Sequence, residues 1–313
     1  MNISCFDESL SFAASIVLSV WLASSGLAAV IGNAVVLWLF YKNESLRTIS
    51  NRFLASLWAA DFLIGLVISP VWMVIRCWIK PPGTATVLIK VLDMLWIHST
   101  AATMFNLCCV SVDRFIVIRF PFRYQDIITK KRCYAVIIIV WLTSLILPAF
   151  PVIFEDVENL WPFLIVLMVY IPIALVTLCY VWIYKAARRQ ATAIRRVTQT
   201  GVESTLAVEN YKAIKTVGFV LGVFLASWMP SSVVFVVHYL AESDSCADHK
   251  LYTVVWPWVE AIALTSSAIN PWVYCIRNSE FRQALRRSFL WFFSVEVTPE
   301  RERSPVPYGN QGL

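Results

Sequence analysis

The stretch Asp93–Tyr124, DMLWIHSTAATMFNLCCVSVDRFIVIRFPFRY, decides how this chain folds. It is apolar for about twenty residues, the length that a helix needs to cross the hydrocarbon core of a bilayer. The run ends at Asp113-Arg114, and a basic segment that contains Pro121 and Arg123 follows. Arg114 is therefore placed where the span meets cytoplasmic water. Positive charge collects at that position in any membrane protein, so the rest of the chain must decide whether Arg114 has a specific role.

The composition is that of a membrane protein. Of the 313 residues, 59% are hydrophobic and 15% are charged, and the mean hydropathy is +0.68. A soluble domain of this size needs far more charge on its surface. Long apolar runs recur along most of the sequence, which predicts a polytopic α-helical membrane protein.

Seven apolar windows are long enough to cross a bilayer, with boundaries good to a few residues. They are 12–40, 53–78, 86–119, 134–152, 159–190, 206–240 and 251–276. The predicted fold is an all-α bundle of seven transmembrane helices. The predicted organisation is an extracellular tail over 1–11, the seven-helix domain over 12–276 and a cytoplasmic segment over 277–313.

The cytoplasmic segment begins with a second kind of helix. Phe281, Leu285 and Phe289 recur every four residues, with arginines beside them. This spacing predicts a short amphipathic helix lying on the inner leaflet. Residues 294–313 are polar and rich in proline, which predicts disorder.

The distribution of lysine and arginine predicts the orientation. If the N-terminus is outside, the cytoplasmic segments hold 22 of the 26 lysines and arginines. A bias of this size sets topology, so the N-terminus is expected outside and the basic tail inside. The net charge of +6 is divided among membrane loops. It suits anionic lipids and an acidic intracellular partner, and it does not suggest nucleic acid.

The N-terminal segment carries two further signals. Its first ten residues contain Asp7 and Glu8 and have no basic start, so no cleavable signal peptide is expected and the first span would act as its own insertion signal. Asn2-Ile3-Ser4 is a glycosylation sequon on the expected outer side.

Every predicted span carries a polar, proline or tryptophan marker. The markers, in chain order, are Asn33, Asp61, Asp113-Arg114, Trp141, Pro172 with Tyr180, the run Phe224 to Pro230 that includes Trp228, and Asn270-Pro271-Trp272-Val273-Tyr274. A carboxylate such as Asp61 at mid-membrane costs several kcal/mol unless it is paired, hydrated or bound to a cation, so its default interpretation is functional; the alternative is a protonated, hydrogen-bonded structural residue. Each intrahelical proline permits a kink. Taken together and in this order, the markers resemble the rhodopsin-like G-protein-coupled receptors over nearly the whole chain.

The resemblance implies a plasma-membrane receptor that binds an extracellular ligand and activates a heterotrimeric G protein. Arrestin, a receptor kinase and membrane lipids are implied as further partners. At rest Arg114 is implied to pair with Asp113 or to pack under the sixth span, and on activation to swing toward Tyr180 and Tyr274 as that span moves outward. The implied switch comprises Asp113, Arg114, Pro172, Tyr180, Phe224, Trp228, Pro230, Asn270, Pro271 and Tyr274. Asn210 occupies the place of the family's arginine-locking acid, so raised basal activity is a hypothesis.

The resemblance also implies an allosteric sodium pocket. Its residues would be Asp61, Thr103, Ser266 and Asn270. Family members more often carry Ser and Asn where this chain has Thr103 and Ser266, so an occupied and an unused site both stay open. No other cofactor is expected.

The cysteines depart from the family. Most members join the outer end of the third span to the second outer loop by a disulfide. Here Ile89 stands at the first place, and the loop over 152–159 contains no cysteine. A bridge between Cys5 and Cys246 in the oxidising outer compartment and a pair of free thiols both stay open.

The ligand pocket is less defined. Trp96 stands where amine receptors carry their acid, and Leu264 stands where retinal-binding opsins carry their lysine. Carboxylates combined with aromatic rings suit a cation, so a cationic amine or peptide is the expected ligand. The candidate ligand-binding residues are Asp93, Trp96, Trp228, Phe235, Trp256 and Glu260. For Asp93 a purely structural role stays open, and for Glu260 a solvated position at the rim.

The expected class is an orphan receptor near two branches. Asp93, the short second outer loop without cysteine and the cysteine in the third outer loop resemble the melanocortin receptors. The loop around Arg123-Tyr124 and the last two spans resemble the amine and trace-amine receptors.

Two other classes remain open. A seven-helix transporter would carry several mid-membrane charges, whereas Asp61 is nearly alone. A receptor-like chain that serves as a non-signalling partner or decoy would not need Asp113-Arg114 or the 270–274 motif. The three histidines are scattered, and the sequence contains no metal-ligand cluster, no nucleophile–base pair and no phosphate loop, so no enzymatic activity is expected.

Overall fold

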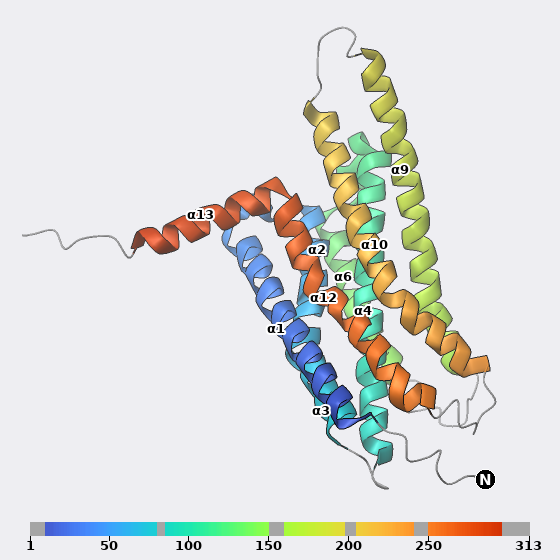
Figure 1. Ribbon diagram of the computed structural model, residues 1–313. Coiled ribbons are helices and arrows are strands. Elements are labelled where there is room, and N and C mark those ends of the chain that lie inside the picture. Colours follow the sequence, from blue (N-terminus) through green and yellow to red (C-terminus); the bar gives the residue numbers. More distant parts are fainter. Residues whose placement is uncertain (1–9, 80–84, 150–159, 198–204, 241–249, 296–313) are drawn as a thin grey trace, which may run out of the picture.

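A computed structural model of the chain describes residues 10–79, 85–149, 160–197, 205–240 and 250–295. These residues are almost entirely helical, and no strand lies among them. Figure 1 shows the long helices side by side in one bundle. The helices form seven columns, which coincide with the seven predicted spans. The columns are α1 (Phe12–Lys42), α2 (Ile49–Leu63) with α3 (Ser69–Cys77), α4 (Ala85–Arg119), α6 (Lys130–Ile146), α8 (Leu160–Ile165) with α9 (Ile171–Val197), α10 (Thr205–Leu240), and α12 (Trp256–Arg277).

Side chains cap the starts of α1, α2 and α6. Ser11 accepts a hydrogen bond from the amide of Ala14 at the start of α1. Thr48 and Thr129 do the same at the starts of α2 and α6. Each hydroxyl oxygen satisfies one of the amides that a helix leaves without an internal partner.

Among the residues that the structure describes, three columns contain a π-helical turn, at Ile64–Ile68, Val166–Tyr170 and Leu251–Val255. After each turn the next amide donates to the carbonyl five residues earlier, as Ser69 does to Ile64. Such a turn admits one extra residue into a helix, and π turns are frequent at functional sites. Hydropathy alone predicts uninterrupted spans here, because it carries no information on hydrogen-bond register.

Small residues allow the columns to approach closely. α1 packs against α12, α2 and α3, while α4 packs against α2, α6 and α9. A methyl group on Gly65 would lie 2.6 Å from the carbonyl oxygen of Gly26, and one on Gly32 would lie 2.6 Å from Cγ of Pro271. Glycine at these contacts allows α1 to pack closely against the second and seventh columns. Small residues serve this purpose in membrane proteins, where no hydrophobic driving force brings helices together.

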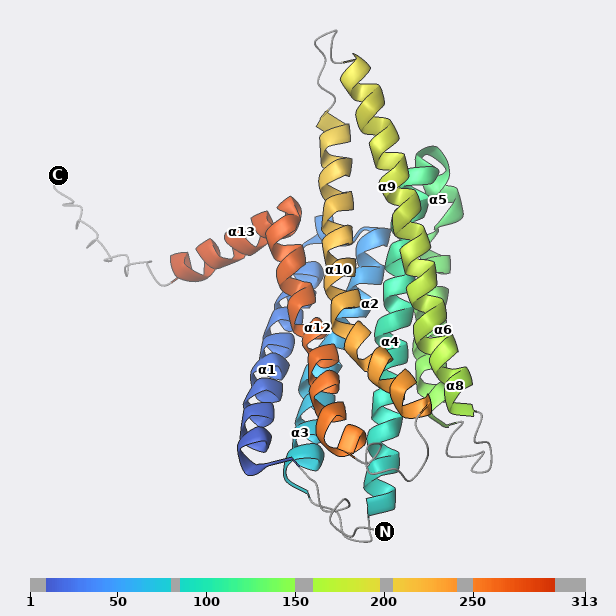
Figure 2. The ribbon, with the colours of Figure 1, turned by 45° about the vertical axis from the view of Figure 1, so that its right-hand side comes forward.

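The two ends of the bundle differ. The Trp96 end holds the beginning of α1 and the end of α3, and the Arg114 end holds the end of α4 and the beginning of α2. In Figures 1 and 2, α9 and α10 extend past the other helices at the Arg114 end. At the same end, α13 (Ser279–Val295) leaves the bundle sideways.

The amphipathic character predicted for α13 is confirmed over its described side chains. Phe281 and Ala284 are buried against the bundle, whereas Arg282, Arg286 and Arg287 are exposed. The side chain of Phe289, the third member of the predicted apolar face, lies outside the described part.

The outer faces of the columns are apolar. Along α6, for example, Ile138, Ile139 and Leu142 are exposed. Five of the described helices or helix pairs are long and apolar enough to cross a membrane, and the described part of α10 adds a shorter apolar stretch, Gly222–His238. Exposed apolar side chains on this scale suit a surface covered by lipid acyl chains.

Candidate functional site

At the Trp96 end, four aromatic rings from three columns form a continuous stack. The rings of Trp72 (α3) and Trp96 (α4) have centroids 5.6 Å apart and planes 29° apart. Trp96 lies equally close to Trp228 of α10, at 5.6 Å and 35°, and Trp228 lies 5.7 Å from Phe224 one turn away. These separations are those of favourable aromatic pairs. We call these four residues the aromatic stack.

A buried ion pair caps the stack. Nη2 of Arg76 lies 3.3 Å from Oε1 of Glu260, whose side chain is 1% exposed. Nε1 of Trp72 donates a hydrogen bond of 2.7 Å to Oε2 of the same carboxylate. The Arg76 guanidinium also lies over the Trp72 ring, 5.1 Å from its centroid. Both carboxylate oxygens of Glu260 are therefore engaged by α3.

The position of Glu260 corrects its interpretation as a solvated rim residue. Glu260 is buried because Arg76, in the last turn of α3, supplies the compensating charge. By sequence, Arg76 is one of the four lysines and arginines on the expected outer side. An arginine followed by Cys77-Trp78 at a helix end carries no periodic signal that would have placed it inside.

The other candidate ligand residues are only partly brought together. Trp96 and Trp228 touch directly in the aromatic stack. Phe235 and Trp256 are half-buried residues of α10 and α12 at the same end. Asp93 belongs to α4, three residues before Trp96, but its side chain lies outside the described part.

A second polar centre lies in the middle of the bundle around Asp61. Asp61 is 0% exposed, and Nδ2 of Asn270 donates a hydrogen bond of 2.8 Å to its Oδ2. Within the described part, Oδ1 of Asp61 and Oγ1 of Thr103 are buried and make no hydrogen bond of normal geometry, and the Ser267 hydroxyl lies near the Asp61 carboxylate. The Ser266 hydroxyl is directed to the carbonyl of Ala263 at 2.7 Å. The predicted sodium residues thus include one carboxylate oxygen and one hydroxyl oxygen without a normal hydrogen bond, which fits a small cation.

At the Arg114 end, the carboxylate of Asp113 is shared by two hydroxyl donors. The Tyr124 hydroxyl donates to Oδ1 at 2.7 Å, and the Ser50 hydroxyl donates to Oδ2 at 2.6 Å. The expected pairing of Asp113 with Arg114 is not what the structure shows, because Asp113 points toward α2 and the loop that contains Tyr124. The alternative prediction was that Arg114 packs under the sixth span. The α10 side chains that it would contact lie outside the described part.

The proline and aromatic residues of the predicted switch lie along the bundle core. Pro172 is buried, and its carbonyl lies 3.8 Å from the thiol of Cys108. Phe224 packs in the same hydrophobic cluster as Met104, and Tyr180 packs beside Cys108 in a smaller one. Pro230 and Pro271 lie inside α10 and α12.

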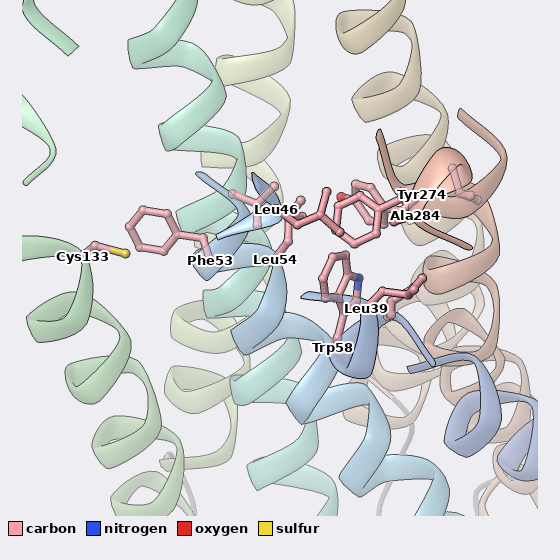
Figure 3. Close-up of a cluster of buried hydrophobic side chains, with 12 residues drawn as sticks. Leu39, Leu46, Phe53, Leu54, Trp58, Cys133, Tyr274 and Ala284 are labelled. Atoms are coloured by element: carbon pink, nitrogen blue, oxygen red, sulfur yellow. The ribbon is translucent and has the colours of Figure 1, made fainter. Parts of the chain in front are cut away.

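Trp58 was missed by the sequence reasoning. Its indole lies 5.7 Å from the ring of Tyr274 and 5.2 Å from that of Phe281, both edge-on. The cluster in Figure 3 thereby joins α2, α12 and α13. A tryptophan in an apolar span gives no sequence signal for such a role.

Two grooves open at the Arg114 end among the described residues. One, of about 510 Å³, is lined by residues that include Ser50, Tyr124 and Lys130. The other, of about 410 Å³, follows α9 and is lined by Tyr180, Val181, Tyr184, Lys185, Arg188 and Arg189. Phe122, in the loop between α4 and α6, is 100% exposed. This end therefore offers a basic groove along α9, a more polar groove at Tyr124, and the exposed apolar side chain of Phe122.

A seven-column apolar bundle with a buried central carboxylate and with prolines inside α10 and α12 has the architecture of a seven-helix membrane receptor. The sequence matches the family described as 7 transmembrane receptor (rhodopsin family) over residues 32–162 and 158–274. The chain belongs to this family and is a membrane protein.

Curated relatives agree with the family assignment. Human adenosine receptor A2a is 28% identical over 306 residues, covering 87% of this chain and 72% of the relative. The histamine H2 receptor of Cavia porcellus is 27% identical over 300 residues, covering 88% and 79%. Octopamine receptor beta-2R of Chilo suppressalis is 24% identical over 319 residues, covering 85% and 78%. All three are receptors for small ligands, and the amine receptors among them are consistent with the predicted branch.

Proposed function

We propose that the chain is a plasma-membrane receptor that couples a small extracellular ligand, bound at the Trp96 end, to a heterotrimeric G protein at the Arg114 end. Relatives named for adenosine, histamine and octopamine support a small ligand. The excess of lysine and arginine in segments at the Arg114 end supports the orientation with the N-terminus outside.

The position of Trp228 is the observation that carries this proposal. Trp228 lies in the aromatic stack, and Pro230, two residues further along α10, removes a backbone hydrogen bond from the same helix. A ligand that moves Trp96 moves Trp228, and Pro230 is the point at which α10 can bend in response. α10 is also one of the helices that extend farthest at the Arg114 end (Figure 2). Ligand binding would shift the population toward a conformation in which that end of α10 has moved outward.

For a cationic ligand, Asp93 is the proposed counter-ion. Glu260 already accepts from Arg76 and Trp72, so an ammonium group would have to displace an arginine to reach it. Asp93 is one helical turn above Trp96, whose ring would contact the rest of the ligand. A peptide ligand would have to present its cationic group in the same way.

For sodium, the proposed ligands are Asp61, Thr103, Ser266 and Asn270. The unsatisfied oxygens of Asp61 and Thr103 support this assignment. Sodium supplies the positive charge that a buried carboxylate needs. Ser266 would have to rotate away from the Ala263 carbonyl, and Asn270 would hold the second oxygen of Asp61.

The Arg114 end is the proposed docking surface for the G protein, and arrestin and a receptor kinase are proposed to use the same end. The basic groove along α9 and the exposed Phe122 suit a partner with acidic and apolar groups. Asn2, Cys5 and Cys246 lie outside the described residues, so glycosylation and the Cys5–Cys246 bridge stay predictions.

The test is G-protein activation in cells that express the chain, normalised to receptor at the surface. Arg114→Ala is expected to remove the basal signal. With a panel of small amines, Asp93→Asn is expected to raise the half-maximal concentration about tenfold or more, which corresponds to about 1.4 kcal/mol, while Glu260→Gln is not expected to raise it. Equal signals from the wild type and Arg114→Ala, across G-protein classes, would favour the non-signalling partner.

A further inference from the structure

We infer that Arg76 and Glu260 are positioning residues that hold α10 at rest, acting through Trp72 and Trp96 on Trp228. The inference rests on the proposed receptor function and names a control point within it. Phe224 and Trp228 belong to the predicted switch. The other residues of the aromatic stack and its ion-pair cap do not.

The Arg76–Glu260 ion pair joins two columns at the Trp96 end. Glu260 of α12 and Arg76 of α3 form an ion pair in which the glutamate side chain is 1% and the arginine 11% exposed. A buried pair of this kind holds its partners strongly in place, because removing one partner leaves an uncompensated charge in a low dielectric. The pair therefore ties the seventh column to the second at the Trp96 end.

The second step is the orientation of Trp72. Its Nε1 donates to Oε2 of Glu260 at 2.7 Å, and the Arg76 guanidinium covers its ring at 5.1 Å. The indole is thus held both in its plane and on one face. Without the carboxylate, Nε1 of Trp72 loses this acceptor and the guanidinium loses its contact with Glu260, so the Trp72 ring is held less firmly.

The third step is transmission. Trp96 stacks on Trp72 on one side and contacts Trp228 on the other. An indole that is packed on one side cannot rotate without displacing its neighbour, because protein interiors are close-packed. The cap consequently restrains Trp228, and through Trp228 it opposes the bending of α10 at Pro230. Coupling between distant sites needs a packed element with two discrete arrangements that both sites can bias. Here that element is α10, bent or unbent at Pro230.

The experiment measures basal G-protein activation per surface receptor in a double-mutant cycle. Glu260→Gln and Arg76→Met each remove one charge, and the double variant removes both, which keeps the net charge of the site unchanged if a single variant folds poorly. The double variant is expected to raise basal signalling about fivefold, the low end of known coupling between sites. Trp21→Leu is the control, because Trp21 makes an edge-on contact with Trp258 at the same end without touching the aromatic stack.

The route through the aromatic stack is tested separately. Trp96→Leu interrupts the stack and leaves the ion pair in place. In that background the Glu260→Gln change is expected to have no further effect on basal signalling. An undiminished effect would show that the ion pair acts by some other route and would overturn the inference.

A second measurement does not depend on signalling. Hydrogen exchange of the purified receptor is expected to accelerate over residues 224–238 in the double variant and to stay unchanged in Trp21→Leu. Unchanged exchange in the double variant would overturn the inference while leaving the proposed function standing. Absence of an Arg114-dependent signal in the wild type would contradict the proposed function itself.

Discussion

The hydroxyl of Tyr124 lies 2.7 Å from Oδ1 of Asp113 and donates to it. This bond spans from the last part of α4 to α5 (Tyr124–Ile127), the single turn that follows Pro121–Arg123. Together with Ser50 at 2.6 Å, Tyr124 keeps the carboxylate turned away from Arg114. Arg114 is thereby left to other partners, and the loop is fixed to the end of α4.

Replacing Tyr124 by phenylalanine removes this donor without changing the ring. One acceptor site on a buried carboxylate then loses its partner, a loss of about 1.5–3 kcal/mol for a hydrogen bond to a charged group. We expect Tyr124→Phe to lower G-protein activation several-fold at equal surface expression, because the loop loosens and Asp113 becomes available to Arg114. Tyr170→Phe, at an exposed position, should behave like the wild type.

The same contact has a defined pH dependence. Burial, above all, raises the pKa of Tyr124 from its ordinary value of 10.0. A raised pKa in the folded state means that the stability contributed by the protonated hydroxyl is complete below about pH 10 and is lost as the pH rises through the folded value. The difference in melting temperature between wild type and Tyr124→Phe in detergent should therefore stay constant from about pH 7 to pH 9. A difference that shrinks within this range would contradict the assignment.

Phe281 and Phe122 form a matched pair of phenylalanines with opposite environments. Phe281 is 0% exposed against Trp58, whereas Phe122 is 100% exposed. Phe281→Ala should destabilise the receptor by about 3–5 kcal/mol, the cost of truncating a buried aromatic side chain, seen as a lower melting temperature. Phe122→Ala should leave the melting temperature unchanged and lower G-protein activation. Equal melting temperatures for the two variants would contradict the packing of α13.

Gly65 and Gly222 form a second matched pair. A methyl group on Gly65 would lie 2.6 Å from the Gly26 carbonyl oxygen and 2.9 Å from Cβ of Ala29, whereas one on Gly222 would meet nothing within 4 Å. Gly65→Ala should cost about 1–3 kcal/mol through overpacking. Gly222→Ala should be neutral or stabilise by about 0.4–1 kcal/mol, since alanine restricts the unfolded chain. The melting temperatures of the two purified variants test this prediction, and equal values would contradict it.

Sodium binding predicts a salt-specific stability. The wild type should melt at a higher temperature in sodium chloride than in choline chloride of equal concentration, since a ligand that binds only the folded state stabilises it. Asp61→Asn should remove the difference. Thr103→Val should reduce it, because the hydroxyl is one of the two unsatisfied groups. The same melting temperature in both salts for the wild type would exclude the site.

Hydropathy and charge were sufficient to predict the seven columns and the amphipathic helix at Phe281. Apolar runs of this length have few alternatives in a bilayer, where every backbone group must be satisfied within its own segment. The markers of the family led to Asp61 and Asn270, whose hydrogen bond lies between residues 209 positions apart.

Contacts between columns could not be predicted in the same way. Neither Arg76 nor Glu260 carries a local signal that names its partner, and Trp58 resembles any other apolar residue of its span. The partners of Asp113 depend on how the loop after α4 folds back, which is a tertiary property. The direction in which the side chains of α3 point also depends on the π turn that precedes this helix.

That π turn, Ile64–Ile68, has a consequence for comparing this chain with its relatives. It acts as a one-residue insertion, and each residue advances a helix by about 100°. Deleting one residue of Ile64–Ile68 would turn Trp72 and Arg76 away from Glu260 while leaving Asp61 in place. An alignment with a relative that lacks this turn therefore needs a one-residue gap at Ile64–Ile68. Without the gap, the inward-facing residues of α3 would be aligned with residues that face the lipid.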